Sequence, residues 1–303
     1  MSEPFFKNSK VVGTSYSPEK YHSENGPRGG KDYAVGRSAL MEFCRCEHRW
    51  VAGFEMEDTN ATEWGSAFDC LLLTPERFAA DYAVCPATYP DKKTGEEKPW
   101  TFAATFCKEW RAEHEGRQII KADVYEEITG ALKSAKADQV IGDVLKGADC
   151  QVYITAEYHD STTGLVIPVK TLIDIVPHVG SSWGRSLWDL KSARNAAPGP
   201  WPRVIFERGY DVQAAMSMDI YAAARPDEDR VDFRHAIIEA VKPFEPGKRL
   251  IAEEFVTRGR MVYQQALARY AVCLKTGEWG GYDKDAEFQG CTISSPEAWM
   301  MNP

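Results

Sequence analysis

The chain has 303 residues, of which 44% are hydrophobic and 27% are charged, as is ordinary for a soluble globular protein. The net charge of −9 is not typical of a nucleic-acid binder, but it does not exclude basic residues confined to one channel. No apolar run approaches about 18 residues, and the start MSEPFFKNSK has no apolar signal core. The sequence therefore predicts no membrane span and a location in the cytoplasm.

The first half of the chain is expected to be irregular at its start and helical after it. Residues 1–34 are rich in Gly, Pro, Ser and Asn and show no period, which predicts an N-terminal arm or loops. Apolar residues then recur at helical spacing, as Leu40, Phe43 and Trp50 do. This spacing predicts helices over Gly36–Trp50, Trp64–Leu73, Trp100–Glu115 and Asp123–Ala137, with a polar loop at 86–99.

The second half contains most of the expected strands. Alternation and runs of Val and Ile predict strands over Gln151–Tyr158, Val166–Pro177, Ser186–Lys191, Phe233–Lys242 and Leu250–Val256. Helices are expected over Tyr210–Ala224 and Arg258–Lys275. No internal repeat is evident. We therefore expect, after the arm, one α/β domain over 35–303, with a mixed central sheet, helices on both sides, and a helical N-terminal portion that closes over the site.

A group of charged residues falls on the central strands. Asp174 lies inside an otherwise apolar strand, where a bare carboxylate is costly. Asp189 and Lys191 are two residues apart and therefore share one face of their strand, and Glu157 lies on a preceding strand from which it can converge with them. Carboxylates hold hard cations such as Mg²⁺, and a lysine beside them can orient an attacking water. The pattern favours phosphodiester hydrolysis, while a surface hairpin with scattered charges remains the alternative.

These residues resemble the motif of the PD-(D/E)XK nuclease superfamily. Asp174 corresponds to its first acid, and Asp189-Leu190-Lys191 corresponds to its (D/E)-x-K, with Ile173 in the place of the proline. More widely, the chain resembles the phage-type exonuclease VIII (RecE-like) nuclease domain. The stretches that carry this likeness are TEWGSAFDCLLLTPERF (62–78), the 151–191 core, YDVQAAMSMDIYAAA (210–224) and YAVCLKTGEWGGY (270–282).

The resemblance implies a restriction-endonuclease-like fold and a Mg²⁺-dependent exonuclease, with Mn²⁺ as a substitute. It implies digestion of linear double-stranded DNA from 5′ ends to leave 3′ single strands for recombination. It also implies a ring-shaped homo-oligomer, a single-strand annealing recombinase as partner, and the cytoplasm of a bacterial or phage-infected cell.

The resemblance also suggests roles for single residues. Asp174, Asp189 and the Leu190 carbonyl are expected to bind metal, with Glu157 as a further ligand, and Lys191 is expected to position the water. Asp69 stands where many relatives carry a metal-binding histidine, and it is expected either to replace that ligand or to be an acid on the exposed edge of its helix.

Residues that contact DNA are expected on the following helix and loop. In the resembled family, a glutamine on the helix beside the metal site contacts the DNA backbone, and Gln213 corresponds to it. Tyr221 shares a helix face with Gln213 and is a candidate for the tyrosine that often accompanies it. Arg194 and Arg203 flank a proline-rich loop near the site and are candidates for phosphate contact, or else solvated surface charges.

Two further questions stay open in the sequence. The eight cysteines include no C-x-x-C, so they indicate reduced, buried thiols in preference to an iron–sulfur cluster near Cys44 and Cys46. The activity itself has alternatives: a non-catalytic protein that binds DNA ends, or a nuclease of another specificity, such as an endonuclease or a single-strand-specific enzyme.

Overall fold

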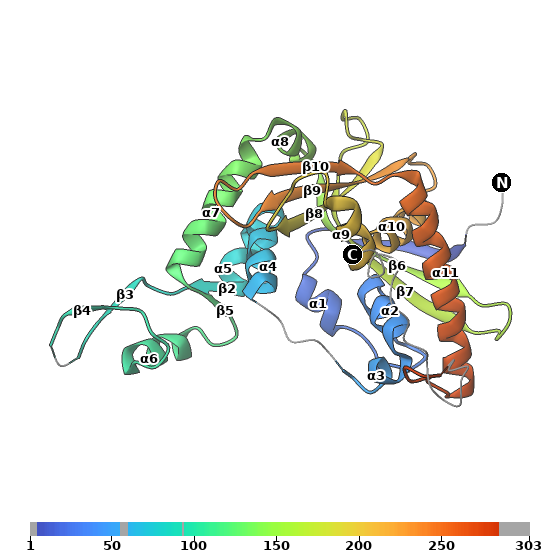
Figure 1. Cartoon of the computed structure of the whole chain (residues 1–303), viewed down its shortest axis with the longest axis horizontal. Coiled ribbons are helices and arrows are strands. Elements are labelled where there is room, and N and C mark those ends of the chain that lie inside the picture. The colour runs from blue at the N-terminus through green and yellow to red at the C-terminus, as the bar shows by residue number, and fades with distance from the viewer. Residues whose placement is uncertain (1–4, 55–59, 93, 285–303) are drawn as a thin grey trace, which may run out of the picture.

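A six-stranded mixed sheet runs through the centre of the protein (Figure 1). The computed structural model describes residues 5–54, 60–92 and 94–284. The sheet order is β1-β6-β7-β8-β9-β10, in which β8 and β9 are parallel and all other neighbours are antiparallel. Its strands are β1 (Phe6–Gly13), β6 (Asp149–His159), β7 (Val166–Val176), β8 (Ser186–Ala193), β9 (Asp232–Glu239) and β10 (Pro246–Leu250).

Helices and small strands surround this sheet. The helical elements are α1 (Pro18–Ser23), α2 (Arg37–Arg45), α3 (Glu47–Val51), α4 (Asn60–Leu73), the 3-10 turn η1 (Pro75–Arg77), α5 (Phe78–Asp81), α6 (Thr105–Glu113), α7 (Ala122–Ala137), α8 (Gln139–Leu145), α9 (Trp201–Arg208), α10 (Tyr210–Ala224) and α11 (Glu253–Thr276). The small strands are β2 (Tyr82–Val84), β3 (Thr88–Pro90), β4 (Glu97–Pro99) and β5 (Gln118–Ile120). No helix in the described part of the chain has the length and apolar character needed to cross a membrane.

The sheet separates two hydrophobic cores. On one face, α2, α10 and α11 pack against the sheet, and on the other face α4, α7 and α8 do so. Strand β8 serves both cores, because Leu187 faces the first while Trp188 and Leu190 face the second. The prediction of an α/β fold with a mixed sheet and helices on both sides is therefore confirmed.

Close packing of α10 against α11 stabilises the first core. A Cβ atom on Gly259 of α11 would lie 2.1 Å from the backbone oxygen of Asp211, so only glycine fits at this approach. The contact holds α10, which carries one of the predicted site residues, firmly against the sheet.

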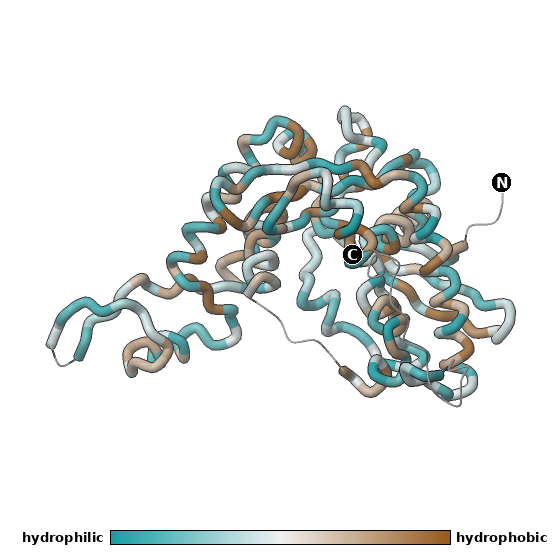
Figure 2. Tube along the Cα trace, viewed as in Figure 1, coloured by the Kyte–Doolittle hydropathy of each residue, from teal (hydrophilic) through white to brown (hydrophobic). Residues whose placement is uncertain are grey.

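One part of the molecule projects from the body. The hairpin of β3 and β4 and the helix α6 extend away from the sheet (Figure 1), and the tip of the hairpin is largely hydrophilic (Figure 2). The predicted loop at 86–99 thus contains a short hairpin. Helix α6 is shorter than the expected Trp100–Glu115 helix.

Three expectations about secondary structure are wrong. Residues 1–34 are not irregular throughout, since β1 pairs with β6; a bulge between Lys7 and Lys10, with Asn8 at φ 50°, had masked its alternation. The helix over Gly36–Trp50 is broken at Cys46, which is extended. The last strand is β10, not Leu250–Val256, and Glu253 and Glu254 form the favourable acidic first turn of α11. The division into an arm and a domain stays a prediction.

Candidate active site

Three acids and a lysine come together where α4 approaches the neighbouring inner strands β7 and β8. Ile175 of β7 pairs with Trp188 of β8, so the antiparallel register sets Asp174 opposite Asp189. Lys191 follows Asp189 on the same strand face and forms an ion pair with it. Asp69 reaches the group from α4, which approaches β8 closely at Gly65: a Cβ atom there would lie 2.9 Å from Ser192 Oγ.

Asp189 is the most firmly held of the three acids. Its side chain is 2% exposed; Oδ1 accepts a hydrogen bond of 2.6 Å from Gln213 Nε2, and Oδ2 is paired with the Lys191 ammonium. Burial acts to raise its pKa, but the positive charge of Lys191 holds the pKa of Asp189 below its usual range. This carboxylate is charged at neutral pH.

The pKa values of Asp174 and Asp69 are shifted in the opposite direction to that of Asp189. Asp174 accepts from the Leu190 N–H at 2.8 Å and from Gln151 Nε2 at 3.4 Å, while Asp69 Oδ1 is closed off from solvent and has no hydrogen-bond partner among the described residues. Burial, reinforced by the Asp189 charge, raises the pKa of Asp174 well above its usual range. Burial also raises the pKa of Asp69 to about 7, against the opposing effect of Lys191.

The donor set fits a divalent cation. The three carboxylates lie near a single lysine that pairs with Asp189, and the Asp69 oxygen without a partner among the described residues is the kind of hard ligand that Mg²⁺ prefers. As the side chains stand, the described residues contain no group of three His, Cys, Asp or Glu placed to hold a metal ion. In the same arrangement, Gln213 donates a hydrogen bond to Oδ1 of Asp189 and Lys191 pairs with its Oδ2.

Lys191 itself is enclosed. Burial acts to lower its pKa, but the Asp189 charge keeps the pKa of Lys191 above its usual value, so it is a cation. Its Nζ lies 4.6 Å from the centroid of the Tyr210 ring, which forms a wall on its other side.

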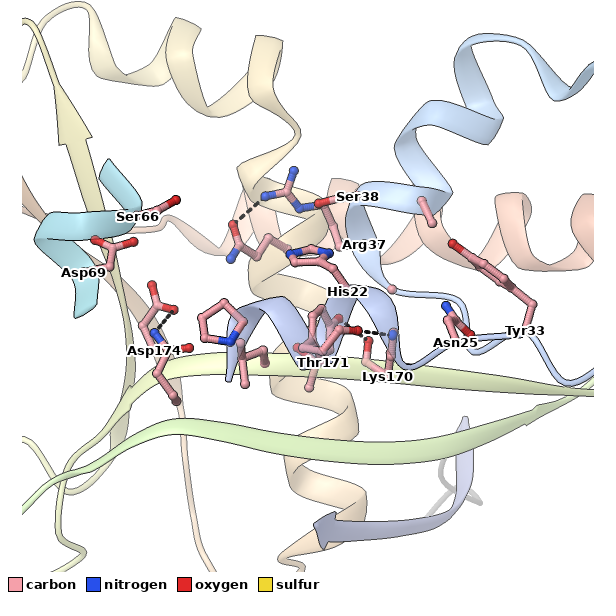
Figure 3. Close-up of a pocket in the computed structure, with 17 residues that line it drawn as sticks. His22, Asn25, Tyr33, Arg37, Ser38, Ser66, Asp69, Lys170, Thr171 and Asp174 are labelled. Atoms are coloured by element: carbon pink, nitrogen blue, oxygen red, sulfur yellow. Dashed lines mark hydrogen bonds between the residues drawn. The ribbon is translucent and has the colours of Figure 1, made fainter. Parts of the chain in front are cut away.

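A cavity of about 280 Å³ opens beside Asp69 and Asp174. Figure 3 shows these two acids at one end, and Arg37 and Lys170 farther along it. Arg37 donates to Gln213 Oε1 at 3.0 Å, and Lys170 donates to the Tyr21 carbonyl. Burial lowers the pKa of Lys170 to about 8, so it still carries most of a charge at neutral pH. The cavity therefore has an acidic end for a cation and a basic remainder for an anion.

The structure separates Glu157 from this group, which corrects the expected convergence. The residue that faces Asp174 from β6 is Gln151, since its neighbours Cys150 and Val152 pair with Ile175 and Ile173. Glu157 lies six residues further along (151 to 157), or about 20 Å. It is instead hydrogen bonded to Asn8 at 2.7 Å and to His159 at 2.8 Å.

Tyr221 is also remote from the site. It lies eight residues after Gln213 (213 to 221), or about 12 Å along α10, and its buried hydroxyl donates to Glu228 at 2.6 Å and receives a hydrogen bond from Arg230. These contacts make it a structural residue of the far end of the helix, so a DNA contact at the site is not supported.

The two expected phosphate-binding arginines are exposed. Arg194 follows directly after β8. Helix α9 begins at Trp201, where the proline-rich loop ends, so Arg203 lies on this helix. The Nε of Arg203 donates a hydrogen bond of 2.6 Å to Glu207. Neither lines the cavity. Their role stays a prediction. Cys291 lies outside the described residues, and the described cysteines are free thiols.

Several residues at the site were not expected. Gln151 could have been found from strand pairing, had the register been known, and Tyr210 from its i, i+3 spacing to Gln213. Arg37 and Lys170 had no local signal, since they lie far from the motif in sequence. His235 pairs with Asp189 across the parallel ladder, and burial lowers its pKa to about 3, so it is neutral.

Comparisons with known proteins agree with this fold. Residues 36–289 match the model of a family described as "PDDEXK-like domain of unknown function (DUF3799)". A crystal structure of a protein from Eubacterium rectale, named "Putative exonuclease", has a TM-score of 0.58 at 14% identity, over 95% of this chain and 98% of that chain. No curated protein matches the chain significantly. The expectation of a restriction-endonuclease-like fold is confirmed.

Proposed function

The chain belongs to this family of PDDEXK-like domains, and from that premise we propose that it is a metal-dependent nuclease. One observation carries the proposal: the buried Asp189 and the half-buried Asp69 and Asp174 lie together beside a single lysine, which pairs with Asp189, and the pKa values of Asp69 and Asp174 are raised. Such an excess of partly desolvated acid costs stability unless a cation joins it, and perturbed carboxylates of this kind are typical of functional sites.

Each residue would have a separate task. A bound divalent ion would polarise the scissile phosphate and acidify a water. Asp174, Asp189 and the Leu190 carbonyl, with Asp69 from α4, would hold that ion. Lys191, oriented by the Asp189 carboxylate and the Tyr210 ring, would hold the attacking water by donating a hydrogen bond to it.

The remaining cavity residues would position the substrate. Gln213 bridges Asp189 and Arg37, so it ties the acidic end of the cavity to its basic side. Arg37 and Lys170 would then bind phosphate oxygens next to the bond that is cut. Such phosphate contacts fix the position of the nucleic acid on the protein without reading its sequence.

The finer proposal is an exonuclease of the exonuclease VIII type. It would use Mg²⁺, or Mn²⁺ in its place, to digest linear double-stranded DNA from 5′ ends and leave 3′ single strands. A ring-shaped homo-oligomer and a single-strand annealing recombinase belong to the same proposal. The four stretches of sequence likeness support it, and three of them form α4, the β7–β8 core and α10, the elements that build the site.

Digestion of end-labelled linear duplex DNA tests the function. The wild-type protein is expected to degrade it with Mg²⁺ and to stop with EDTA, while a closed circular duplex of the same sequence stays intact. Asp174→Asn should be inactive, and Glu157→Gln, which removes an acid remote from the site, should match the wild type. Cleavage that persists in EDTA would exclude the metal mechanism, and cleavage of the circle would favour an endonuclease.

A non-catalytic DNA-end-binding protein is the second candidate. It is favoured by one observation, namely that Lys191 and Gln213 occupy both oxygens of Asp189. Calorimetric titration with Mg²⁺ separates the two functions. If the protein is a nuclease, the wild type should bind Mg²⁺ and Asp174→Asn should bind it more weakly. If it is a non-catalytic binding protein, the wild type should show no saturable heat.

A further inference from the structure

A second cavity lies on the opposite side of α4 from the acids. It has a volume of about 550 Å³ and lies between α4, β5, the start of α7 and the base of the projecting part. On α4, Ser66 and Asp69 line the first cavity, while Glu63, Trp64 and Ala67 line the second. The two cavities are thus separated by one helix, and Trp64 and Asp69 are about 8 Å apart along its axis.

The second cavity combines positive charge with an exposed aromatic ring. Arg111, Arg117 and Lys121 line it, against Glu63 as the one acid among its lining residues, although the whole chain carries a net charge of −9. Phe102 is 41% exposed, and the Arg111 guanidinium and Lys121 ammonium lie 5.1 Å and 5.9 Å from its ring centroid.

The walls between these groups are apolar. Ile119, Ile120 and Val124 line the cavity. Trp64 is 7% exposed, and its indole Nε1 has no hydrogen-bond partner among the described residues, so a buried donor is left for an acceptor to satisfy.

We propose that this cavity binds a single-stranded segment of the polynucleotide substrate as that strand leaves the cleavage site past α4. An unpaired base would stack on Phe102, and phosphates would bind Arg111, Arg117 and Lys121, which is the combination found in single-strand binding sites. A duplex does not fit this chemistry, because its bases are already stacked on one another. The assignment rests on the proposed function, since a nuclease that consumes one strand releases the other unpaired.

Fluorescence anisotropy with a labelled oligothymidylate of about 20 nucleotides, in EDTA to prevent cutting, tests the proposal. Phe102→Ala should weaken binding about tenfold because a stacking contact is lost. Phe102→Tyr keeps an aromatic face and should bind within about twofold of the wild type. Phe54→Ala is the matched control, since Phe54 is also exposed with an arginine over its ring, that of Arg49, but belongs to the region of α3.

Charge is tested separately by salt dependence. Arg111→Ala should reduce the slope of log affinity against log salt by about 0.7, the value for one phosphate contact on a single strand. Lys146→Ala removes an exposed lysine paired with Asp143 outside the cavity and should leave the slope unchanged. A free mononucleotide at millimolar concentration should not displace the oligonucleotide; displacement would show a nucleotide site and overturn the assignment.

The outcomes distinguish this inference from the nuclease itself. Phe102→Ala should melt at the wild-type temperature, because Phe102 is an exposed side chain, and cleavage of a blunt duplex by the wild type with Mg²⁺ tests the nuclease separately. If the wild type fails to cut, the nuclease is refuted while the binding result still stands. Absence of single-strand binding by the wild type, or equal binding by Phe102→Ala, would overturn the proposal that this cavity binds a single strand. So would a change in oligomeric state in Phe102→Ala, which would show that a second copy occupies the cavity.

Discussion

Glu47 of α3 is buried, whereas Asp69 of α4 is half-buried with its Oδ1 closed off from solvent, and the surroundings of the two acids differ. Glu47 is surrounded by donors: Arg269 Nε at 2.9 Å, the Gly280 N–H at 2.8 Å, and the Lys284 ammonium. Asp69 Oδ1 has no donor among the described residues. Burial acts to raise both pKa values, yet the donors hold the pKa of Glu47 at about 2, while that of Asp69 rises to about 7.

The difference separates an acid with a structural role from one for which we propose a functional role. The Glu47 cluster is complete, and it ties α3 to α11 and to the stretch that follows α11. The Asp69, Asp174 and Asp189 group is incomplete, because its one lysine in contact serves Asp189. An acid that is desolvated without a hydrogen-bond donor costs stability, and such acids are typical of sites that bind a ligand or carry out chemistry.

The largest contrast is expected between two lysines that each pair with a buried acid. Lys191→Ala should reduce Mg²⁺-dependent cleavage of linear duplex DNA by about 100- to 1,000-fold, because the group that holds the attacking water is lost. Metal affinity should be kept, since lysine is not a ligand, and calorimetric Mg²⁺ titration checks this. Lys284→Ala, at the Glu47 cluster, should cleave at the wild-type rate and lose only stability. Wild-type turnover by Lys191→Ala would remove Lys191 from the mechanism.

The next effect is on folding. Glu47→Gln should lower the free energy of unfolding by about 2 kcal/mol at pH 7, since Arg269 and Lys284 lose a charged partner but remain partly in water. Because the pKa of Glu47 is depressed in the folded state, its stabilisation is full above about pH 4.3 and is lost as the pH falls towards 2.

Urea unfolding of both proteins at pH 7 and near pH 2 measures this effect. The difference should close at the low pH. A constant difference would mean that Glu47 contributes through packing, and the comparison with Asp69 would fail. Cleavage by Glu47→Gln should be unchanged.

Much of the site could be predicted from the sequence because its main parts are local. The period of two sets Asp189 and Lys191 on one strand face, and the apolar run around Asp174 marks a central strand. The helix expected over Tyr210–Ala224 has the same bounds in the structure. Local periodicity is sufficient where one element carries both residues of a pair.

The residues that were missed depend on register and on long-range packing. A strand sequence does not state which of its residues faces a neighbour, so Glu157 was expected at the position that Gln151 occupies. Strand β1 has a bulge that interrupts its alternation. Arg37 and Lys170 reach the cavity only because α2 and β7 pack around it, and no local pattern indicates that arrangement.

The smallest effect is expected at Asp69, and it has the opposite sign to that at Glu47. Because the pKa of Asp69 is raised in the folded state, the unfolded chain ionises first, and stability falls as the pH rises from about 4 to about 7. Asp69→Asn should therefore increase the free energy of unfolding in EDTA at pH 8 by about 1–2 kcal/mol, and the gain should vanish below about pH 4.

Mg²⁺ should stabilise the wild type more than Asp69→Asn, by mass action on the folded state, and the variant should need more Mg²⁺ for cleavage. Thermal unfolding with and without Mg²⁺ measures both effects. If Asp69→Asn is instead less stable in EDTA and has the wild-type Mg²⁺ requirement, Asp69 is held by donors as Glu47 is, and the site consists of Asp174, Asp189 and Lys191 without a contribution from α4.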